Sequence, residues 1–131
     1  MPFYRISEIE KKPAGLTEGT MQTVAGELMK VGMVTYPEGF GPPAHVHPNE
    51  EQYILVMEGK IQMVLGDEER TIGPGDLVHI PRNTSHGIRV LEGGAVFFTA
   101  KSPAGDGNLN QDYNEAKDAG EIRERLSAAG G

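Results

Sequence analysis

The stretch that decides the fold is GFGPPAHVHPNEEQYILVMEG, residues 39 to 59. Its two histidines, His45 and His47, are two positions apart, and residues at i and i+2 of a β-strand point to the same face of the sheet. A run of β-branched and other apolar residues follows them and stops at Gly59. The stretch therefore predicts two imidazole rings side by side on one strand, as a metal chelate needs.

A third histidine, His86, lies about forty residues further on, in the segment PRNTSHGI. A single His-x-His pair is weak evidence for a metal site, because exposed histidine pairs are common. A third histidine placed after a Gly-x5-Pro turn makes the evidence much stronger. The chain has no cysteine, so any bound metal must be held by nitrogen and oxygen atoms.

Two segments resemble the two sequence motifs of the cupin superfamily. The first motif, Gly-x5-His-x-His-x(3 or 4)-Glu-x6-Gly, is matched by Gly39, His45, His47 and Gly59. The second motif, Gly-x5-Pro-x-Gly-x2-His-x3-Asn, is matched after a gap of fifteen residues by Gly75, Pro81 and His86. The resemblance covers about residues 29 to 100, and two motifs in register are far more specific than either alone.

The resemblance implies an all-β fold, the cupin double-stranded β-helix or jelly-roll barrel of two antiparallel sheets. It implies a single cupin domain over residues 1–131, with the barrel core at about 20–100. The tail, 101–131, has a different composition and predicts two short helical turns, NQDYNEAKDAG and EIRERLSAAGG, separated at Gly120. We interpret this tail as a packing or capping element.

The first motif leaves two neighbours, Glu51 and Gln52, as candidates for the fourth ligand. Counting back six residues from Gly59 gives Gln52, whereas Glu51 leaves seven. Adjacent strand residues face opposite sides of the sheet, so only one of them can face the histidines. The fixed distance to the turn favours Gln52 over Glu51, and Glu50 is expected to be solvated. The predicted ligands of one divalent ion (iron, manganese, nickel, cobalt or zinc) are His45, His47, Gln52 and His86.

The second motif departs from the pattern at two positions. Asn83 stands at its glycine, a mild change because asparagine tolerates a left-handed backbone. Val90 stands at its asparagine, so the hydrogen bonds of that side chain are missing.

Glycine and proline recur at intervals of about ten residues, as turn residues do in an all-β chain. MEGK at 57–60 and LGDEER at 65–70 predict hairpin connections. The runs YILVM and IQMVL are apolar on both faces, so both faces are expected to be covered. The cover is either a second subunit, which makes the protein a homodimer, or the chain's own N-terminal arm and C-terminal tail. Tyr36 and Phe97 are expected in the core rather than in a substrate pocket.

A glutamine oxygen is a neutral ligand, and with three neutral imidazoles it leaves the charge of the metal uncompensated, which makes a stronger Lewis acid. The predicted function is therefore a metal-dependent isomerase, lyase or cyclase acting on a small anionic or oxygen-rich metabolite. An O2-dependent dioxygenase and a non-catalytic metal- or sugar-binding cupin are the alternatives. The candidate general bases are Glu51, His79 and Asp106.

The predicted ligand set is also similar to that of the small ring-opening cupins of uronate catabolism. Those proteins use acidic and arginine residues beyond the last strand. Here the corresponding segment offers Asp106 but no arginine before Arg123. The similarity therefore stops at the ligands.

The formal net charge of -7 and the scattered basic residues argue against a nucleic-acid partner. The N-terminal residues MPFYRISEIEKK mix charged with apolar side chains and leave no apolar core for a signal peptide. The longest purely apolar run, YILVM, is far shorter than the ~20 residues of a membrane helix. We expect a cytoplasmic protein with a small-molecule substrate and neither nucleic acid nor membrane as a partner.

Overall fold

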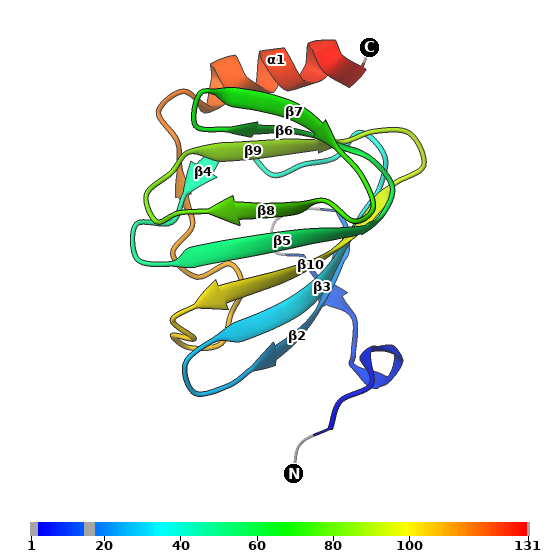
Figure 1. Ribbon diagram of the computed structural model, residues 1–131, viewed down its shortest axis with the longest axis vertical. Coiled ribbons are helices and arrows are strands. Elements are labelled where there is room, and N and C mark those ends of the chain that lie inside the picture. Colours follow the sequence, from blue (N-terminus) through cyan, green and yellow to red (C-terminus); the bar gives the residue numbers. More distant parts are fainter. Residues whose placement is uncertain (1–2, 15–17, 131) are drawn as a thin grey trace.

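The computed structural model describes residues 3–14 and 18–130 and contains two antiparallel sheets and a C-terminal helix (Figure 1). The six-stranded sheet has the order β1 (Lys12–Pro13), β2 (Thr20–Ala25), β3 (Lys30–Tyr36), β10 (Ala95–Ser102), β5 (Glu51–Glu58) and β8 (Leu77–Ile80). The five-stranded sheet has the order β11 (Asn114–Glu115), β4 (His45–Val46), β9 (His86–Val90), β6 (Ile61–Leu65) and β7 (Glu68–Ile72). A 3-10 helix, η1 (Ile6–Glu8), precedes β1, and helix α1 (Ala119–Gly130) follows β11.

From β3 to β6, and again from β7 to β11, successive strands alternate between the sheets, which confirms the predicted all-β jelly-roll fold. Strand β4 belongs to the five-stranded sheet, β5 to the six-stranded sheet and β6 to the five-stranded sheet again. The prediction of a hairpin at 57–60 is wrong, because the chain crosses there from one sheet to the other. The prediction of a hairpin at 65–70 is confirmed, since β6 and β7 pair with Leu65 opposite Glu68.

Gly59 makes the crossing between β5 and β6 possible. Its φ is +84°, and a Cβ atom added to it would lie 2.1 Å from the carbonyl oxygen of Gly94. Both the backbone conformation and the close approach exclude a larger residue. The end of β5 is therefore fixed, and a bulge between Val56 and Glu58 separates this end from the regular alternation of the strand.

Alternate strand residues from both sheets fill the space between the sheets. On β5, Gln52, Ile54 and Val56 are buried, whereas Tyr53 and Met57 are exposed. The burial of apolar area between the sheets is the main favourable term for such a fold. The core includes Val34, Tyr36, Ile54, Val56, Ile61, Met63, Ile80, Ile88, Val90 and Phe97.

The turn before β9 connects the two motif segments. Asn83 has a φ of 61°, which is the left-handed conformation predicted for it. Its backbone N–H donates a hydrogen bond to the carbonyl oxygen of His47, with the two atoms 2.9 Å apart. Asparagine thus serves here where the motif has glycine.

The C-terminal tail differs from the prediction of two helical turns. Residues 114 and 115 form strand β11, which pairs with β4, and a single helix starts at Ala119 and passes through Gly120. Backbone pairing with β4 outweighs the helical tendency of this part of the tail. No helix in the described ranges is both long and apolar enough to cross a membrane.

Helix α1 covers one of the two outer faces that the sequence predicts to be covered. Ile122 and Leu126 pack against Ala44 and Val64 on the outside of the five-stranded sheet. The run IQMVL is thus covered by the chain's own tail. The outer face of β5 and β8 is different, because it exposes 43% of Tyr53, 46% of Met57 and 64% of Leu77.

A buried ion pair joins β3 to the start of β5. The Nζ atom of Lys30 lies 2.6 Å from a carboxylate oxygen of Glu50, and the side chains are 0% and 3% exposed. The expectation that Glu50 is solvated is therefore wrong. Lys30 also donates to the carbonyl oxygen of Asn108, at 2.8 Å, and so connects the loop after β10 to the barrel.

We predict that Glu50→Gln lowers the free energy of unfolding by about 3 to 5 kcal/mol, because it leaves the Lys30 ammonium group buried without its carboxylate. Urea unfolding followed by circular dichroism measures the change. The matched control is Glu51→Gln on the next residue, whose exposed carboxylate pairs only with His79; it should have little effect. Equal stability of the two variants would contradict a structural role for the Lys30–Glu50 pair.

Candidate metal centre

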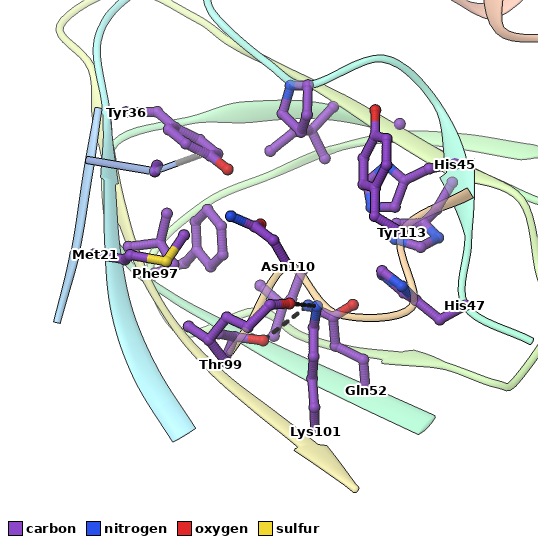
Figure 2. Close-up of a pocket in the computed structure, with 18 of the residues that line it drawn as sticks. Met21, Tyr36, His45, His47, Gln52, Phe97, Thr99, Lys101, Asn110 and Tyr113 are labelled. Atoms are coloured by element: carbon purple, nitrogen blue, oxygen red, sulfur yellow. Dashed lines mark hydrogen bonds between the residues drawn. The ribbon is translucent and has the colours of Figure 1, made fainter. Parts of the chain in front are cut away.

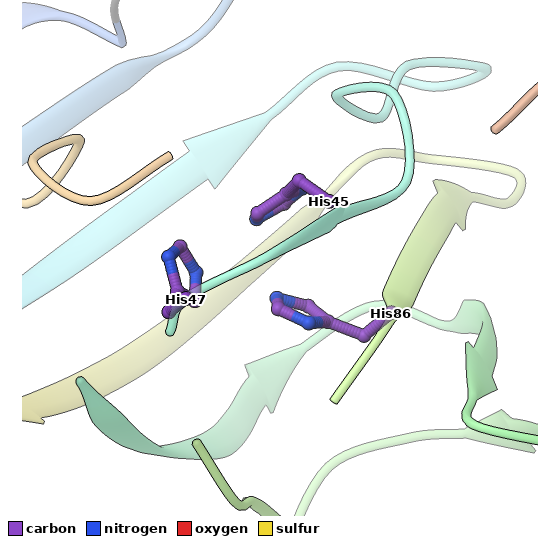
Figure 3. Close-up of side chains that lie close together, drawn as sticks. All are labelled: His45, His47 and His86. Atoms are coloured by element: carbon purple, nitrogen blue, oxygen red, sulfur yellow. The ribbon is translucent and has the colours of Figure 1, made fainter. Parts of the chain in front are cut away.

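Three histidines meet inside the barrel at the end of β4 (Figure 3). His45 lies on β4 and is the direct partner of His86 on β9, and His47 follows β4. The ring centroids are 4.3 Å apart for His45 and His86, 4.8 Å for His45 and His47, and 5.0 Å for His47 and His86. One ring nitrogen of each lies within 4.8 Å of the others, so these residues can hold a metal ion.

Hydrogen bonds to the backbone fix the tautomer of all three rings. A carbonyl oxygen only accepts, so each Nδ1 atom must carry the proton and donate it, which leaves the lone pair on Nε2. Such bonds orient metal-binding histidines in proteins. The donor and acceptor pairs are His45 and Pro43 at 2.8 Å, His47 and Asp112 at 3.0 Å, and His86 and Thr84 at 3.0 Å.

The three imidazoles are also held in the neutral form that a metal requires. Burial lowers the pKa of His45 to about 3, and the neighbouring His86 lowers it further. Burial likewise lowers the pKa of His47 and of His86 to about 4 each. Near neutral pH the rings therefore carry no positive charge that would repel a cation.

Gln52 points into the same cavity from β5, with 6% of its surface exposed. The Thr99 hydroxyl group on β10 donates its hydrogen to the carbonyl oxygen of Tyr53, with the oxygen atoms 3.1 Å apart. Because this hydrogen is used, the Thr99 oxygen accepts its other hydrogen bond from the Gln52 amide nitrogen, at 2.8 Å. This orients the Gln52 Oε1 atom away from Thr99. Among the described residues, three buried side-chain atoms have no hydrogen-bond partner: Oε1 of Gln52, Nε2 of His47 and one carboxylate oxygen of Glu50.

The lone pairs of Gln52 Oε1 and His47 Nε2 have no hydrogen-bond partner in the described ranges and lie beside two further imidazoles, an arrangement that fits a divalent cation. Burying a polar atom without a partner costs free energy, and a metal ion would satisfy both atoms at once. Three nitrogen donors and one amide oxygen suit the borderline transition metals and zinc.

The candidate general bases lie away from this group. Glu51 and His79 are on the outer face of the six-stranded sheet, where a carboxylate oxygen of Glu51 and Nε2 of His79 are 2.7 Å apart. Tyr53 stacks on His79 there. Asp106 is exposed in the loop after β10, where it accepts a hydrogen bond from the backbone of Asn108. None of the three candidates lines the cavity.

The cavity itself has a volume of about 580 Å³ and a clear division of character (Figure 2). Tyr36, Met21 and Phe97 lie on one side of it, whereas His45 and His47 lie on the other. Gln52, Thr99 and Lys101 are grouped together at a third position. The cavity can therefore hold a molecule with an apolar body and an oxygen-bearing polar end.

Several of these cavity residues were missed or assigned to the core at the sequence level. Tyr36 and Phe97 belong to the core and also line the cavity, and burial raises the pKa of Tyr36 to about 12. Tyr113 stacks on His45, with centroids 4.4 Å apart, although its segment was predicted to be helical. Burial lowers the pKa of Lys101 to about 8, and the Glu50 carboxylate opposes this shift. The inward position of Lys101 could have been found from the sequence, because side chains alternate between the two faces of the sheet along β10.

A two-sheet jelly roll that encloses three neutral histidines defines a class of metal-binding β-barrel proteins. Residues 32–100 match the family model described as a cupin domain, and this match covers more than half of the chain. The chain belongs to the cupin family.

One curated relative and several solved structures are similar to the chain. Quercetin 2,3-dioxygenase of Bacillus subtilis (strain 168) is 32% identical over 65 residues, which is 50% of this chain but only 19% of that protein. KdgF from Halomonas sp. superposes with a TM-score of 0.73 at 24% identity, covering 79% of this chain and 94% of its own. The polyketide cyclase RemF from Streptomyces resistomycificus gives 0.67 at 23% identity, covering 79% of each chain. An RmlC-like cupin from Shewanella frigidimarina NCIMB 400 gives 0.71 at 19% identity, covering 78% and 90%. The structural matches support the fold alone.

We predict that the purified protein binds one divalent ion and that His47→Ala abolishes this binding. Gln52→Ala should weaken it, because an amide oxygen is a weaker donor than an imidazole nitrogen. Elemental analysis and titration of the metal-free protein with Co2+ or Zn2+ measure both effects. Unchanged metal content in both variants would contradict the predicted ligand set.

The same metal titration of the Thr99→Val variant tests the residue that orients Gln52. Without the hydroxyl group the amide is free to turn, and we expect metal affinity to fall by about tenfold or more, as for other residues that orient a ligand. The matched control is Thr35→Val, which changes a threonine on the outer side of β3. An effect of the same size in both variants would exclude a specific role for Thr99.

The histidines also predict how stability depends on pH in the metal-free protein. Their pKa values are about 3 to 4 in the folded state and near 6.5 in an unfolded chain. Below pH 6.5 the unfolded state binds more protons, so stability should fall as the pH drops from about 6.5 towards 4. Each histidine contributes a slope of up to about 1.4 kcal/mol per pH unit.

Urea unfolding of the metal-free protein at several pH values measures this slope. The His45→Gln variant should have a shallower dependence than the wild-type protein, because one proton fewer is taken up on unfolding. Carboxylates contribute equally to both proteins, so the difference isolates His45. Identical slopes would show that His45 titrates normally in the folded state.

Proposed function

We propose that this cupin is a metal-dependent enzyme that acts on a small anionic or oxygen-rich metabolite by Lewis-acid chemistry. The observation that carries the proposal is the pair of buried, partnerless atoms, Nε2 of His47 and Oε1 of Gln52, beside two further neutral imidazoles. His45, His47, His86 and Gln52 would hold the ion. It would supply a positive charge that polarises a substrate carbonyl or hydroxyl group.

The side chains around the ligands have separate tasks in this proposal. Thr99 holds the Gln52 amide in its orientation through the hydrogen bond at 2.8 Å. The apolar wall of Met21, Tyr36 and Phe97 binds the body of the substrate and excludes water from the polar end. Tyr36 keeps its proton at neutral pH, because burial raises its pKa to about 12, and it can donate a hydrogen bond to a substrate oxygen.

The neutral ligand set favours isomerase, lyase or cyclase chemistry over oxidation. Three imidazoles and an amide leave the charge of a divalent ion uncompensated, which makes it a stronger Lewis acid. A carboxylate ligand would help to stabilise an oxidised metal, and Glu51 faces outward. The buried Glu50 carboxylate lies within 4.8 Å of a ring nitrogen of His47, but it is paired with the Lys30 ammonium group at 2.6 Å. The second candidate function is an O2-dependent dioxygenase, which the similarity to quercetin 2,3-dioxygenase favours. A metal- or sugar-binding cupin without catalysis is the third.

Turnover with and without oxygen distinguishes these functions. The metal-loaded protein is incubated with a panel of small diketones, flavonols and hydroxy acids, and substrate loss and oxygen consumption are recorded. We expect substrate loss under nitrogen as well as in air. Turnover that occurs only in air with matching oxygen uptake would instead assign the dioxygenase. Ligands that raise the melting temperature without turnover would assign the binding protein.

The homodimer predicted from the sequence remains a proposal, with a second copy covering the outer face of β5 and β8. The exposed side chains of Tyr53, Met57 and Leu77 support it, since they form an apolar group on this face. We expect a dimer in sedimentation velocity experiments and a monomer for the Met57→Asp variant. A wild-type protein that sediments as a monomer at micromolar concentration would refute the proposal.

A further inference from the structure

Lys101 is a buried cation that the proposed metal chemistry does not use. It lies on β10, is 6% exposed and lines the cavity next to Gln52 and Thr99 (Figure 2). Its backbone is paired with Gln52 on one side and with Lys30 on the other. Three inward-facing polar residues thus form one row across the six-stranded sheet.

The two lysines in this row differ in how their charges are compensated. Lys30 is fully buried and pairs with Glu50 at 2.6 Å. Lys101 donates a hydrogen bond to the backbone carbonyl of Leu109, but within residues 3–14 and 18–130 it forms no ion pair. The Glu50 carboxylate is shared by the two buried ammonium groups, and the Asp112 carboxylate in the tail also acts on Lys101. Lys101 nevertheless has no direct carboxylate contact in the described part of the chain, and it lines the cavity.

A buried ammonium group without a direct ion pair is costly unless a group of opposite charge contacts it. The Leu109 carbonyl accounts for one of the three donors of the ammonium group. Because Lys101 lines the cavity, a bound molecule can reach the two remaining N–H donors of its ammonium group. The neutral ligands of the proposed metal site add no negative charge, so this part of the cavity attracts anions.

We propose that Lys101 is a specificity-determining residue that binds a carboxylate of the substrate. The substrate class is an organic acid with an apolar, preferably aromatic, body and a second oxygen close to the carboxylate. The carboxylate contacts Lys101, the second oxygen points to the histidines and Gln52, and the body lies against Phe97 and Tyr36. The part of this assignment that concerns the second oxygen rests on the proposed metal function, whereas the contact to Lys101 does not.

The test compares two probes that differ in charge and little else. Salicylate has a carboxylate next to a hydroxyl group on an aromatic ring, and salicylamide is its neutral amide. Calorimetry measures the affinity of both for the metal-free and the zinc-loaded full-length protein. We expect the wild-type protein to prefer salicylate by about tenfold or more, as for a charge-assisted hydrogen bond. No preference, or no salicylate binding at millimolar concentration, would overturn the proposal.

Variants of Lys101 assign the preference to this residue. Lys101→Met should remove it by weakening salicylate binding while leaving salicylamide binding unchanged, and Lys101→Arg should keep part of it. The matched control is Lys60→Met, which removes an exposed lysine at the turn after β5 and should bind both probes as the wild-type protein does. A preference that persists in Lys101→Met would overturn the proposal.

Two readouts keep the result interpretable. The melting temperature and zinc affinity of Lys101→Met are measured first, because this side chain also holds the Leu109 carbonyl. If that variant does not fold, the proposal requires the preference to survive in Lys101→Arg, and its loss there in a folded protein counts against it. A preference that depends on Lys101 in the metal-free protein supports the anion contact even if no metal binds, so the two proposals can fail separately.

Discussion

The register of β5 is the constraint on which the site depends. Side chains along a β-strand alternate between the interior and the exterior of the barrel. A shift of the register by one residue would move every inward side chain to the outside and every outward one to the inside. In this protein the close approach of Gly59 to the Gly94 carbonyl fixes the end of the strand, and a bulge between Val56 and Glu58 shifts the pairing with β10 by one residue. Gln52 consequently shares a face with Ile54 and Val56, and Glu51 shares the outer face with Tyr53. Which of the two neighbours, Glu51 or Gln52, faces the cavity thus depends on the turn at Gly59 and on this bulge together.

The second determinant of the site is desolvation. Burial disfavours the charged form of an imidazole, and the hydrogen bonds from Nδ1 to carbonyl oxygens decide which nitrogen keeps the free lone pair. Two of these hydrogen bonds are local, from His45 to Pro43 and from His86 to Thr84, whereas the bond from His47 to Asp112 reaches a distant segment. The segment around Asp112 belongs to the tail, so the tail contributes to the site as well as covering the barrel. The description of the tail as a packing element was therefore incomplete.

Much of this arrangement could be predicted from the sequence, and the exceptions have physical causes. Motif spacing sufficed for the fold and for the inward orientation of Gln52, although the bulge between Val56 and Glu58 could not be predicted from it. The burial of Glu50 could not be predicted, since its partner Lys30 is twenty residues away and the pairing is set by tertiary packing. The strand at Asn114–Glu115 was missed because a two-residue pairing with β4 has no sequence period. Lys101 was missed because a lysine at a strand end usually reaches solvent, and here the loop that follows covers it.

The positions of Gln52 and Lys101 suit the proposal that the fourth metal ligand is a neutral residue. The two residues are direct partners on adjacent strands and both face inward. A glutamate at position 52 would place a carboxylate opposite the Lys101 ammonium group, at a distance where cross-strand ion pairs form. That pair would neutralise the lysine and reduce the charge of a bound metal ion at the same time. An amide avoids both effects, because its Nε2 atom is occupied by Thr99 and its Oε1 atom carries no net charge. In the proposed function, the positive charges of a bound metal ion and of Lys101 would both be available to one anionic substrate, so a neutral ligand and a buried lysine would serve the same purpose.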